Sequence, residues 1–316
     1  MKTDSSTAIK IKDLHYKYKS DWLGKPFHAL KGINLEVFEG ESFGFLGHNG
    51  AGKTTTIKLL LGLTTITSGS IKIFGKDPKD PSARRSVGYL PEQPYFYDHL
   101  TVQEIMDMYA TLAGIKKDFR QSAIKEALEM VKVSARAKSP MRSLSKGLTQ
   151  RVAMAQAIVG SPKLLILDEP FSGLDPIGRR EFADLMVELK KRGTTIFMSS
   201  HILSDVEFLC DRASIMAYGE LKGVYQLRDI PQMSSGSYEL IIREFDGDLR
   251  DIKSKAAECV IQEKLIRLTF TDRKTAEQVL TEALAMGIAI ESFRFQQGTL
   301  EDLFVELVKF EEAKHQ

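Results

Sequence analysis

A glycine-rich stretch near the amino terminus carries residues whose types and spacing suit phosphate chemistry. Residues 43–60 read FGFLGHNGAGKTTTIKLL, in which Gly47, Gly52, Lys53 and Thr54 fill the pattern G-x-x-x-x-G-K-[ST]. In such a loop, backbone N–H groups surround phosphates, the lysine reaches the β- and γ-phosphates, and the hydroxyl ligates Mg²⁺. Average residue usage produces this pattern by chance in about one chain in a hundred of this length. The pattern therefore predicts a nucleoside triphosphate site.

The elements on either side of this loop support the same prediction. The apolar residues before Gly47 indicate a buried strand, and a helix is expected to begin at Thr54. Glycines at 47, 50 and 52 allow positive φ angles that turn backbone N–H groups toward phosphate oxygens. The helix N-terminus adds partial positive charge beneath them.

Two further groups of polar residues follow apolar strands. Asp168 and Glu169 come after the continuous apolar run 163–167, and His201 follows the strand expected at 194–198. In parallel sheets the carboxyl ends of strands meet at one crevice, where ligands bind. These three residues are therefore expected at the crevice that would hold the phosphates. The alternative for His201 is a hydrogen-bonded structural residue at a strand end.

Composition limits the classes of protein to consider. The 316 residues are 43% hydrophobic and 27% charged, with a net charge of +2, so no nucleic-acid partner is expected. The two cysteines, Cys210 and Cys259, lie far apart without metal-type spacing, which suggests free thiols in a reducing compartment. Residues 1–6, MKTDSS, lack the apolar stretch expected of a signal peptide, and no apolar run approaches the length expected of a membrane span. A cytoplasmic chain that reaches the membrane only through a partner is expected.

Hydrophobic periodicity predicts an α/β domain followed by a smaller one. Strands are expected at 8–18, 33–38, 71–74 and 86–90, and helices at 101–133 and 178–191, with a capping box at Thr101 and Glu104. Residues 144–151 are expected to lead into a further helix that runs through Val159. A Ser- and Gly-rich linker follows near 232–237. Beyond it, strands at 238–243, 265–270 and 288–295 and helices at 276–286 and 299–310 predict a small α+β domain, ferredoxin-like in size. The predicted domains are 7–232 and 236–316.

Taken together, these motifs resemble the ATP-binding subunit of an ABC transporter, over about residues 8–230. In that resemblance, residues 47–54 are the Walker A motif and 164–168 the Walker B motif, and Glu169 is the general base. The resemblance implies a P-loop NTPase core with a parallel sheet, an antiparallel β part and a helical subdomain. It also implies ATP and Mg²⁺ as cofactors.

Other motifs of the family appear in its usual order. Gln93 matches the Q-loop, residues 172–175 the D-loop and His201 the switch histidine, and Tyr18 matches the aromatic residue that stacks on adenine. Tyr16 is the alternative for the adenine contact. The alternative for Gln93 is a residue that caps a turn.

The signature motif departs from the family pattern. The family usually has Leu-Ser-Gly-Gly-Gln, whereas residues 144–148 read LSKGL, so Ser145 and Gly147 are kept and Lys146 and Leu148 are not. In the family this loop binds the γ-phosphate held by the opposite protomer. The resemblance therefore implies composite sites and a dimer as the working unit.

The resemblance assigns a site residue by residue. Glu169 and His201 are assigned to catalysis, and Thr54, Gln93 and Asp168 to the metal. The residues assigned to nucleotide binding are Tyr18, Gly47, Asn49, Gly50, Gly52, Lys53, Thr54, Thr55, Ser145, Gly147 and Asp175.

The carboxyl-terminal sequence narrows the expected function. Residues 298–304, GTLEDLF, resemble a helix of ATPase subunits that serve ABC exporters with separately encoded permeases. The expected function is ATP-driven dimerisation and hydrolysis that power export through an integral membrane permease, on the cytoplasmic face of the membrane. The alternative is a soluble ABC-type ATPase that acts on ribosomes or DNA, although the tandem domains or long coiled-coil insertions of those relatives are not visible. A GTPase is a third option, but the Asn-Lys-x-Asp motif that reads guanine is missing.

Overall fold

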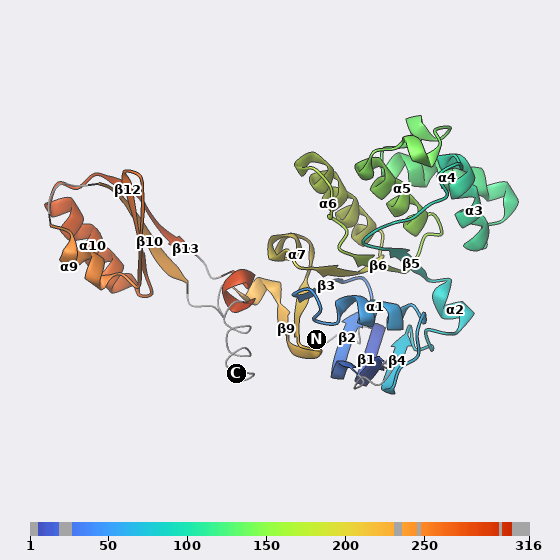
Figure 1. The fold of residues 1–316 in the computed structure, drawn as a ribbon, viewed down its shortest axis with the longest axis horizontal. Coiled ribbons are helices and arrows are strands. Elements are labelled where there is room, and N and C mark those ends of the chain that lie inside the picture. The colour runs from blue at the N-terminus through green and yellow to red at the C-terminus, as the bar shows by residue number, and fades with distance from the viewer. Residues whose placement is uncertain (1–5, 19–26, 231–235, 245–247, 297–298, 305–316) are drawn as a thin grey trace. The chain divides into compact units, whose positions relative to one another are not determined.

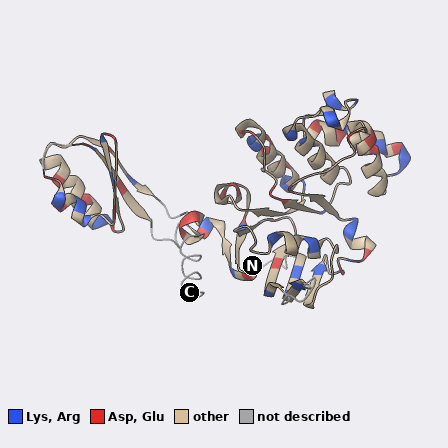
Figure 2. Cartoon of the chain, in the orientation of Figure 1, with Lys and Arg blue, Asp and Glu red and all other residues tan. Residues whose placement is uncertain are grey.

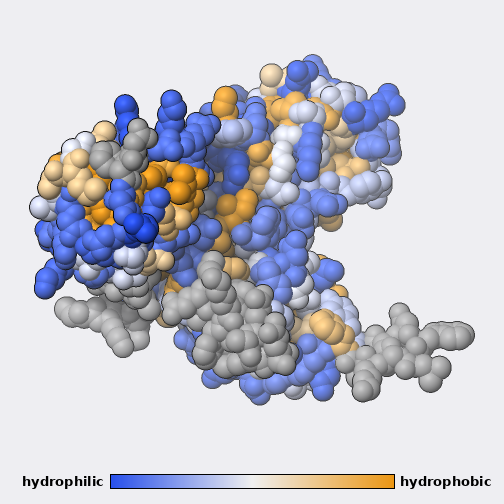
Figure 3. Space-filling view, turned by 60° about the vertical axis from the view of Figure 1, so that its left-hand side comes forward, coloured by the Kyte–Doolittle hydropathy of each residue, from blue (hydrophilic) through white to orange (hydrophobic). Residues whose placement is uncertain are grey.

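The computed structural model describes residues 6–18, 27–230, 236–244, 248–296 and 299–304 (Figure 1). The chain divides into two compact units, Met1–Tyr225 and Gln226–Gln316. This division falls earlier than the predicted boundary at 232, and most of the predicted linker lies outside the described residues. Charged residues of both signs are spread over both units (Figure 2), and hydrophobic residues are scattered over a mainly hydrophilic surface (Figure 3).

The first unit is built on a six-stranded sheet with the order β5-β6-β7-β3-β8-β9. Its strands are β3 (Ser42–Gly47), β5 (Val87–Leu90), β6 (Leu164–Asp168), β7 (Thr195–Ser200), β8 (Arg212–Ala217) and β9 (Glu220–Gln226). The pairs from β5 through β8 are parallel. Every residue of β3, β6 and β7 is buried, as in strands covered on both faces. The carboxyl ends of these three strands therefore meet at one edge of the sheet.

An antiparallel sheet forms the second layer of this unit. Its order is β2-β1-β4, with β1 at Thr7–Tyr18, β2 at Phe27–Phe38 and β4 at Ser68–Ile73. Helix α1 (Lys53–Leu60) contacts strands of both sheets and lies between them (Figure 1). Apolar side chains from both sheets and from α1 share one core. This packing fixes the loop before α1 against the two sheets.

Three helices, α3 (Val102–Leu112), α4 (Lys117–Met130) and α5 (Lys146–Ile158), contact one another in a helical part. The predicted capping box is confirmed, because Thr101 Oγ1 accepts from Glu104 N and Glu104 Oε2 accepts from Thr101 N. The helical stretch predicted for 101–133 consists of two helices, since Gly114 adopts φ +79° just beyond α3. The remaining helices of this unit include α2 (Pro81–Arg84), α6 (Pro176–Lys191) and α7 (Leu203–Leu209).

The second unit follows the chain order β-α-β-β-α-β. Its elements are β10 (Ser237–Arg243), α9 (Arg250–Lys255), β11 (Glu258–Gln262), β12 (Leu265–Phe270), α10 (Arg273–Ala285) and β13 (Ile290–Gln296). The sheet order is β11-β12-β10-β13 with antiparallel pairs, and α9 and α10 cover one face (Figure 1). This is the split βαβ arrangement of a ferredoxin-like domain, as predicted. Of the helix predicted for 299–310, residues 300–304 are helical, Thr299 precedes the helical residues, and 305–310 lie outside the described part.

Among the described residues, no helix combines the length and apolarity that crossing a membrane requires.

Candidate active site

A pocket of about 300 Å³ lies where the glycine-rich loop meets the carboxyl ends of β3 and β6. It brings together most of the residues that the sequence assigned to a nucleotide, along with four that it did not assign, Phe27, Ala29, His48 and Glu92. The full lining is Tyr18, Phe27, Ala29, His48, Asn49, Gly50, Gly52, Lys53, Thr54, Thr55, Glu92, Glu169 and His201.

The glycines of the loop serve two different purposes. Gly50 and Gly52 adopt φ of +83° and +113°, as predicted. A Cβ on Gly52 would also lie 2.6 Å from Met216 Cε. Gly47 does not take the predicted positive φ but ends strand β3, and it must lack a side chain because a Cβ would lie 2.5 Å from Met216 O. Close approach of β8 therefore explains the first glycine, and backbone conformation the other two.

Lys53 is a buried cation at the floor of the pocket, only 6% exposed. Its Nζ donates to Gly47 O at 2.6 Å and to His48 O at 3.4 Å, and it lies 3.5 Å from Glu169 Oε1. Burying an ammonium is costly unless opposite charge lies nearby. The phosphates of a nucleotide would supply such charge.

Glu169 joins the ends of β6 and β7. Its φ of +48° lies in the left-handed region, which non-glycine residues seldom adopt and which is often found at functional sites. Glu169 N donates to both Ser199 O and Ser199 Oγ at 3.2 Å. Its Oε2 lies 2.8 Å from His201 Nδ1 and accepts from His201 N at 3.3 Å. The carboxylate is thereby held between Lys53 on one side and His201 on the other.

Asp168 lies beneath the pocket and is 2% exposed. Ser199 Oγ donates to Asp168 Oδ1 at 2.6 Å. Burial raises the pKa of Asp168, and the neighbouring carboxylates of Glu169 and Glu92 raise it further, against the Ser199 and Thr54 hydroxyls, which lower it. Carboxylate and hydroxyl oxygens gathered in this way match the donors that Mg²⁺ prefers.

Glu92 lines the pocket, whereas the neighbouring Gln93, which the resemblance assigned to the metal, is not part of the lining. Both residues are exposed and follow Leu90, where β5 ends. Glu92 lies close enough to affect Asp168 electrostatically. The side-chain directions after a strand end depend on backbone angles that the sequence does not reveal.

Aromatic side chains border the other end of the pocket. Tyr18 Oη lies 2.9 Å from Thr55 Oγ1, and the Tyr18 ring is 40% exposed. Tyr16 packs edge-on against Tyr18 and does not line the pocket. Phe27, the cross-strand partner of Tyr18, is 64% exposed and does line it. The register of β1 with β2 is the signal that would have identified Phe27.

Ser145, Gly147 and Asp175 do not reach this pocket within the chain. Ser145 begins α5 and its Oγ accepts from Leu148 N at 3.4 Å, whereas Asp175 begins α6 and accepts from Gly178 N at 2.7 Å. Both residues are exposed. The pocket of one chain therefore lacks the contacts that the resemblance assigned to these residues.

Lys146, the unusual residue of the signature, reaches a turn of its own chain. A Cβ built on Gly173 would lie 2.7 Å from Lys146 Nζ, so the lysine side chain covers that glycine. Gly173 adopts φ +74° in the turn that leads into α6. Lys146 thus connects the starts of α5 and α6.

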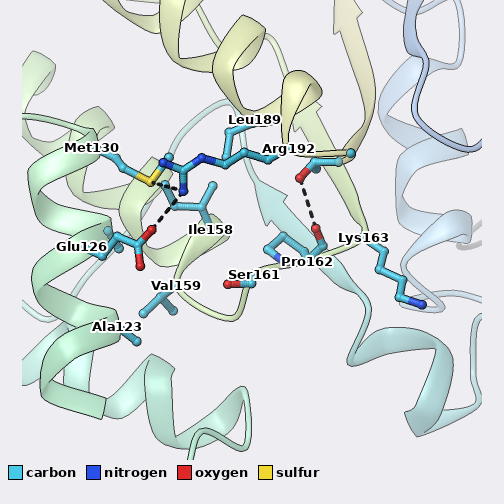
Figure 4. A pocket seen from close by; sticks show the side chains of 13 residues that line it. Ala123, Glu126, Met130, Ile158, Val159, Ser161, Pro162, Lys163, Leu189 and Arg192 are labelled. Carbon is cyan, nitrogen blue, oxygen red and sulfur yellow. Dashed lines mark hydrogen bonds and ion pairs between the residues drawn. The ribbon is translucent and has the colours of Figure 1, made fainter. Parts of the chain in front are cut away.

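A second pocket, of about 230 Å³, lies between α4 and the end of α6 (Figure 4). Arg192 crosses it and donates to Glu126 Oε1 at 2.9 Å and to Met130 Sδ at 3.8 Å. Lys163 precedes β6 and Thr194 precedes β7, so this pocket lies at the amino ends of those strands. It contains none of the predicted site residues.

Comparison with known proteins agrees with this geometry. The model of the ABC transporter family matches residues 30–172. The bacitracin transport ATP-binding protein BcrA of Bacillus licheniformis is 36% identical over 96% of this chain and 98% of its own length. An uncharacterized ABC transporter ATP-binding protein of Synechocystis is 42% identical over 70% of this chain, a match that spans 63% of that relative.

A solved structure extends the likeness to three dimensions. The ATP-binding cassette MJ0796, a dimer in a post-hydrolysis state bound to ADP and Pi, is 26% identical with a TM-score of 0.64, over 70% of this chain and 99% of the cassette. The chain belongs to the ATP-binding proteins of ABC transporters, a family of ATP-hydrolysing enzymes.

Proposed function

We propose that this chain binds and hydrolyses Mg²⁺-ATP and that hydrolysis drives a separate membrane permease. One observation carries the proposal: Lys53, Glu169 and His201 lie in a row inside the pocket formed by the glycine-rich loop, with separations of 3.5 Å and 2.8 Å. The row contains a cation for phosphate, a carboxylate for water and an imidazole beside the carboxylate. These are the groups that phosphoryl transfer to water requires.

The contacts of Glu169 suggest how the protein times proton transfer. Lys53 lies beside Glu169 and offsets its charge. The phosphates of ATP compete for the same ammonium, which leaves the carboxylate free to accept a proton from the attacking water. His201 holds Glu169 through Nδ1, and its other ring nitrogen remains available for the γ-phosphate.

The metal would be held by Thr54, Asp168 and Glu92. Burial of Asp168 beside two other carboxylates leaves a local excess of negative charge, which fits a divalent cation. When bound, Mg²⁺ neutralises charge on the β- and γ-phosphates. In this proposal Glu92 replaces Gln93 as the contact on the strand β5 side.

A second copy of the chain would complete the site. Ser145, Gly147 and Asp175 begin helices at which backbone N–H groups favour anions, yet they do not reach their own pocket. The dimeric cassette MJ0796 supports such an arrangement for a similar protein. The test is light scattering of Glu169→Gln with Mg²⁺-ATP. A dimer that dissociates when ATP is removed is expected, and an ATP-bound monomer would contradict the proposal.

The proposed partner is an integral membrane permease, with the ATPase on the cytoplasmic face and transport in the export direction. The bacitracin transport role in the name of BcrA, which aligns over nearly the whole chain, supports a transport role here. Tyr95 and Tyr97, a few residues beyond the end of β5, are 84% and 57% exposed, whereas Phe96 is buried against Tyr109. We therefore assign permease docking to the two tyrosines and a core role to Phe96.

This assignment is tested with membranes that contain the copurified permease. Tyr95→Ala should leave basal ATP hydrolysis unchanged and abolish its stimulation by the permease. Phe96→Ala serves as the comparison and should lower thermal stability instead. Copurification of the wild-type chain with ribosomes or DNA, and not with a membrane protein, would favour the alternative class of soluble ABC-type ATPases.

A further inference from the structure

A separate cluster of ionisable side chains lies on strands β1 and β2. His15 Nδ1 is 3.3 Å from His28 Nε2, and His15 Nε2 is 3.1 Å from Asp13 Oδ1. The two imidazole rings stack with centroids 5.4 Å apart. None of the three residues lines the nucleotide pocket. The proposed ATPase mechanism does not use this cluster.

The backbone around the cluster adopts an unusual conformation. Asp13 has φ +44°, in the left-handed region that non-glycine residues seldom adopt. The register of β1 with β2 shifts between Ile11 and Leu14, which marks a bulge. Asp13 N donates to Asn34 Oδ1 at 3.0 Å. The strained conformation is thus held by the neighbouring strand and directs the Asp13 carboxylate at His15.

Glycine at position 32 leaves room for this arrangement. A Cβ on Gly32 would lie 3.3 Å from Asp13 Oδ1 and 3.4 Å from His15 Nε2, and Gly32 itself adopts φ +84°. A larger residue would press on the contact between the carboxylate and the imidazole. Two separate backbone features therefore preserve the contact between Asp13 and His15.

The distance between the two imidazole nitrogens suits a shared cation. Zn–N bonds of about 2.0–2.1 Å at a tetrahedral angle separate two ligating nitrogens by roughly 3.3–3.4 Å. An N–H donor usually approaches its acceptor more closely, at about 2.7–3.2 Å. Metal-ligating histidines commonly donate their other ring N–H to a carboxylate, as His15 is placed to do with Asp13.

We propose that His15 Nδ1 and His28 Nε2 bind a Zn²⁺-like divalent transition metal, with Asp13 holding His15 in the ligating tautomer. Within the described ranges, no three His, Cys, Asp or Glu side chains are placed to hold a metal together, so water fills the remaining positions. Nitrogen ligands favour zinc, nickel and copper, whereas the oxygen ligands of the nucleotide site favour Mg²⁺. The two sites therefore select different ions.

Two lysines lie beside the imidazole pair, because Lys17 and Lys31 are the cross-strand partners of His28 and His15. Their charges repel a divalent cation, and the Asp13 carboxylate, which contacts His15, offsets part of that repulsion.

Metal at this position would join β1 to β2 beside the nucleotide pocket. His28 pairs across the strands with Lys17, and the next pair is Phe27 with Tyr18, both of which line the pocket. A bridge between His15 and His28 would fix the strand pair that carries these aromatic residues. The ion is thus expected to raise the melting temperature of the chain.

The test is calorimetric titration of the full chain with Zn²⁺, in excess Mg²⁺ and without nucleotide. All proteins carry Cys259→Ser, because the exposed thiol would also bind zinc. The protein with both histidines should bind one Zn²⁺ ion at this pair, and His28→Asn should lower the Zn²⁺ affinity of that site at least 30-fold. Asp13→Asn should weaken it about 10-fold, the lower end of the loss typical for such outer partners. His99→Asn, a surface histidine elsewhere, should leave it unchanged.

Nitrogen NMR of histidine-labelled protein gives a second readout that needs no variant at the site. Zn²⁺ should shift the ring signals of His15 Nδ1 and His28 Nε2 together at one equivalent. Unchanged ring signals for these two residues, or equal Zn²⁺ affinity in the wild-type protein and His28→Asn, would overturn the proposal.

Discussion

The two units of the chain each bury a glutamate, Glu169 directly after strand β6 and Glu239 within strand β10, but they surround it differently. In the second unit, Glu239 is 3% exposed and lies 2.7 Å from Arg294 and 3.2 Å from Arg267. Gln296 Nε2 also donates to it at 3.2 Å. Both arginines remain half exposed, so their charge stays in contact with water. The side chains around Glu239 thus satisfy it without any ligand.

Glu169 in the first unit has the opposite surroundings. Lys53 is the buried cation beside it, and Asp168 and Glu92 add two more carboxylates nearby. This concentration of negative charge reduces stability unless a cation binds. The contrast teaches that burial of a glutamate does not by itself indicate function. An excess of one charge at a pocket does, because a ligand is needed to balance it.

The largest effect on ligand binding is expected at Lys53. Lys53→Ala removes a charge-assisted phosphate contact that contributes about 1.5–3 kcal/mol, equivalent to a roughly 10- to 150-fold loss of ATP affinity. Calorimetric titration with Mg²⁺-ATP measures it. Lys58→Ala, an exposed lysine on the same helix, is the matched control and should bind ATP normally. Normal affinity in Lys53→Ala would remove the main support for the nucleotide pocket.

The contrast between the glutamates is sharpened by removing Glu239. Glu239→Ala leaves two arginines unpaired on one sheet face, and since both can turn to water we expect a loss of about 1–3 kcal/mol. The loss should be confined to the unfolding of the second unit, measured by hydrogen exchange of β10 and β12. ATP affinity should not change. Reduced ATP affinity in a folded Glu239→Ala protein would show that the second unit contributes to ATP binding, contrary to this account.

Removal of the Asp168 carboxylate should raise the stability of the folded chain, whereas removal of Glu239 should lower it. Because burial raises its pKa in the folded chain, the folded state keeps a proton that the unfolded state has released between the two pKa values. Stability therefore falls as pH rises through that window. Asp168→Asn removes the penalty and should stabilise the chain by about 0.5–2 kcal/mol while it weakens Mg²⁺-dependent binding. Thermal unfolding from pH 4 to 8 tests this, and a less stable variant at pH 7 would contradict it.

A smaller effect is expected at Glu92. Glu92→Gln removes one negative charge near Asp168 and should raise the Mg²⁺ concentration needed for half-maximal ATP binding roughly five-fold, as for a single polar contact. Gln93→Ala, one residue along, should change it less than two-fold. A larger increase in this Mg²⁺ concentration for Gln93→Ala than for Glu92→Gln would indicate that Gln93, and not Glu92, contacts the metal.

The sequence predicted the parts of this site that depend on local pattern. Short-range sequence patterns predict the glycine-rich loop, the apolar strands before Asp168 and His201, and the alternating strands of the second unit. These patterns involve only neighbouring residues, so they can be read without knowledge of the tertiary packing. The structure places Glu169 beside Lys53, 116 positions earlier, because parallel strands bring their carboxyl ends together. That juxtaposition was inferred from the motif order.

What escaped prediction depends on backbone angles and on long-range register. The choice between Glu92 and Gln93 is set by the chain direction after β5, and Phe27 enters the pocket because of the β1–β2 register. Glu239 and Arg294 are 55 positions apart, and neither stands out in an alternating strand. The alternation of apolar and polar residues in a single sequence contains no signal for such a pair.

Paired measurement of ATP turnover in Glu169→Gln and Glu239→Gln at saturating Mg²⁺-ATP tests the central claim most directly. Each variant removes one buried negative charge with almost no change in shape. Loss of a positioned general base predicts a fall of about 10²–10⁴-fold for Glu169→Gln, with ATP still bound, and wild-type turnover for Glu239→Gln. Turnover of Glu169→Gln within a few-fold of wild type would contradict the assignment of this pocket as the catalytic centre.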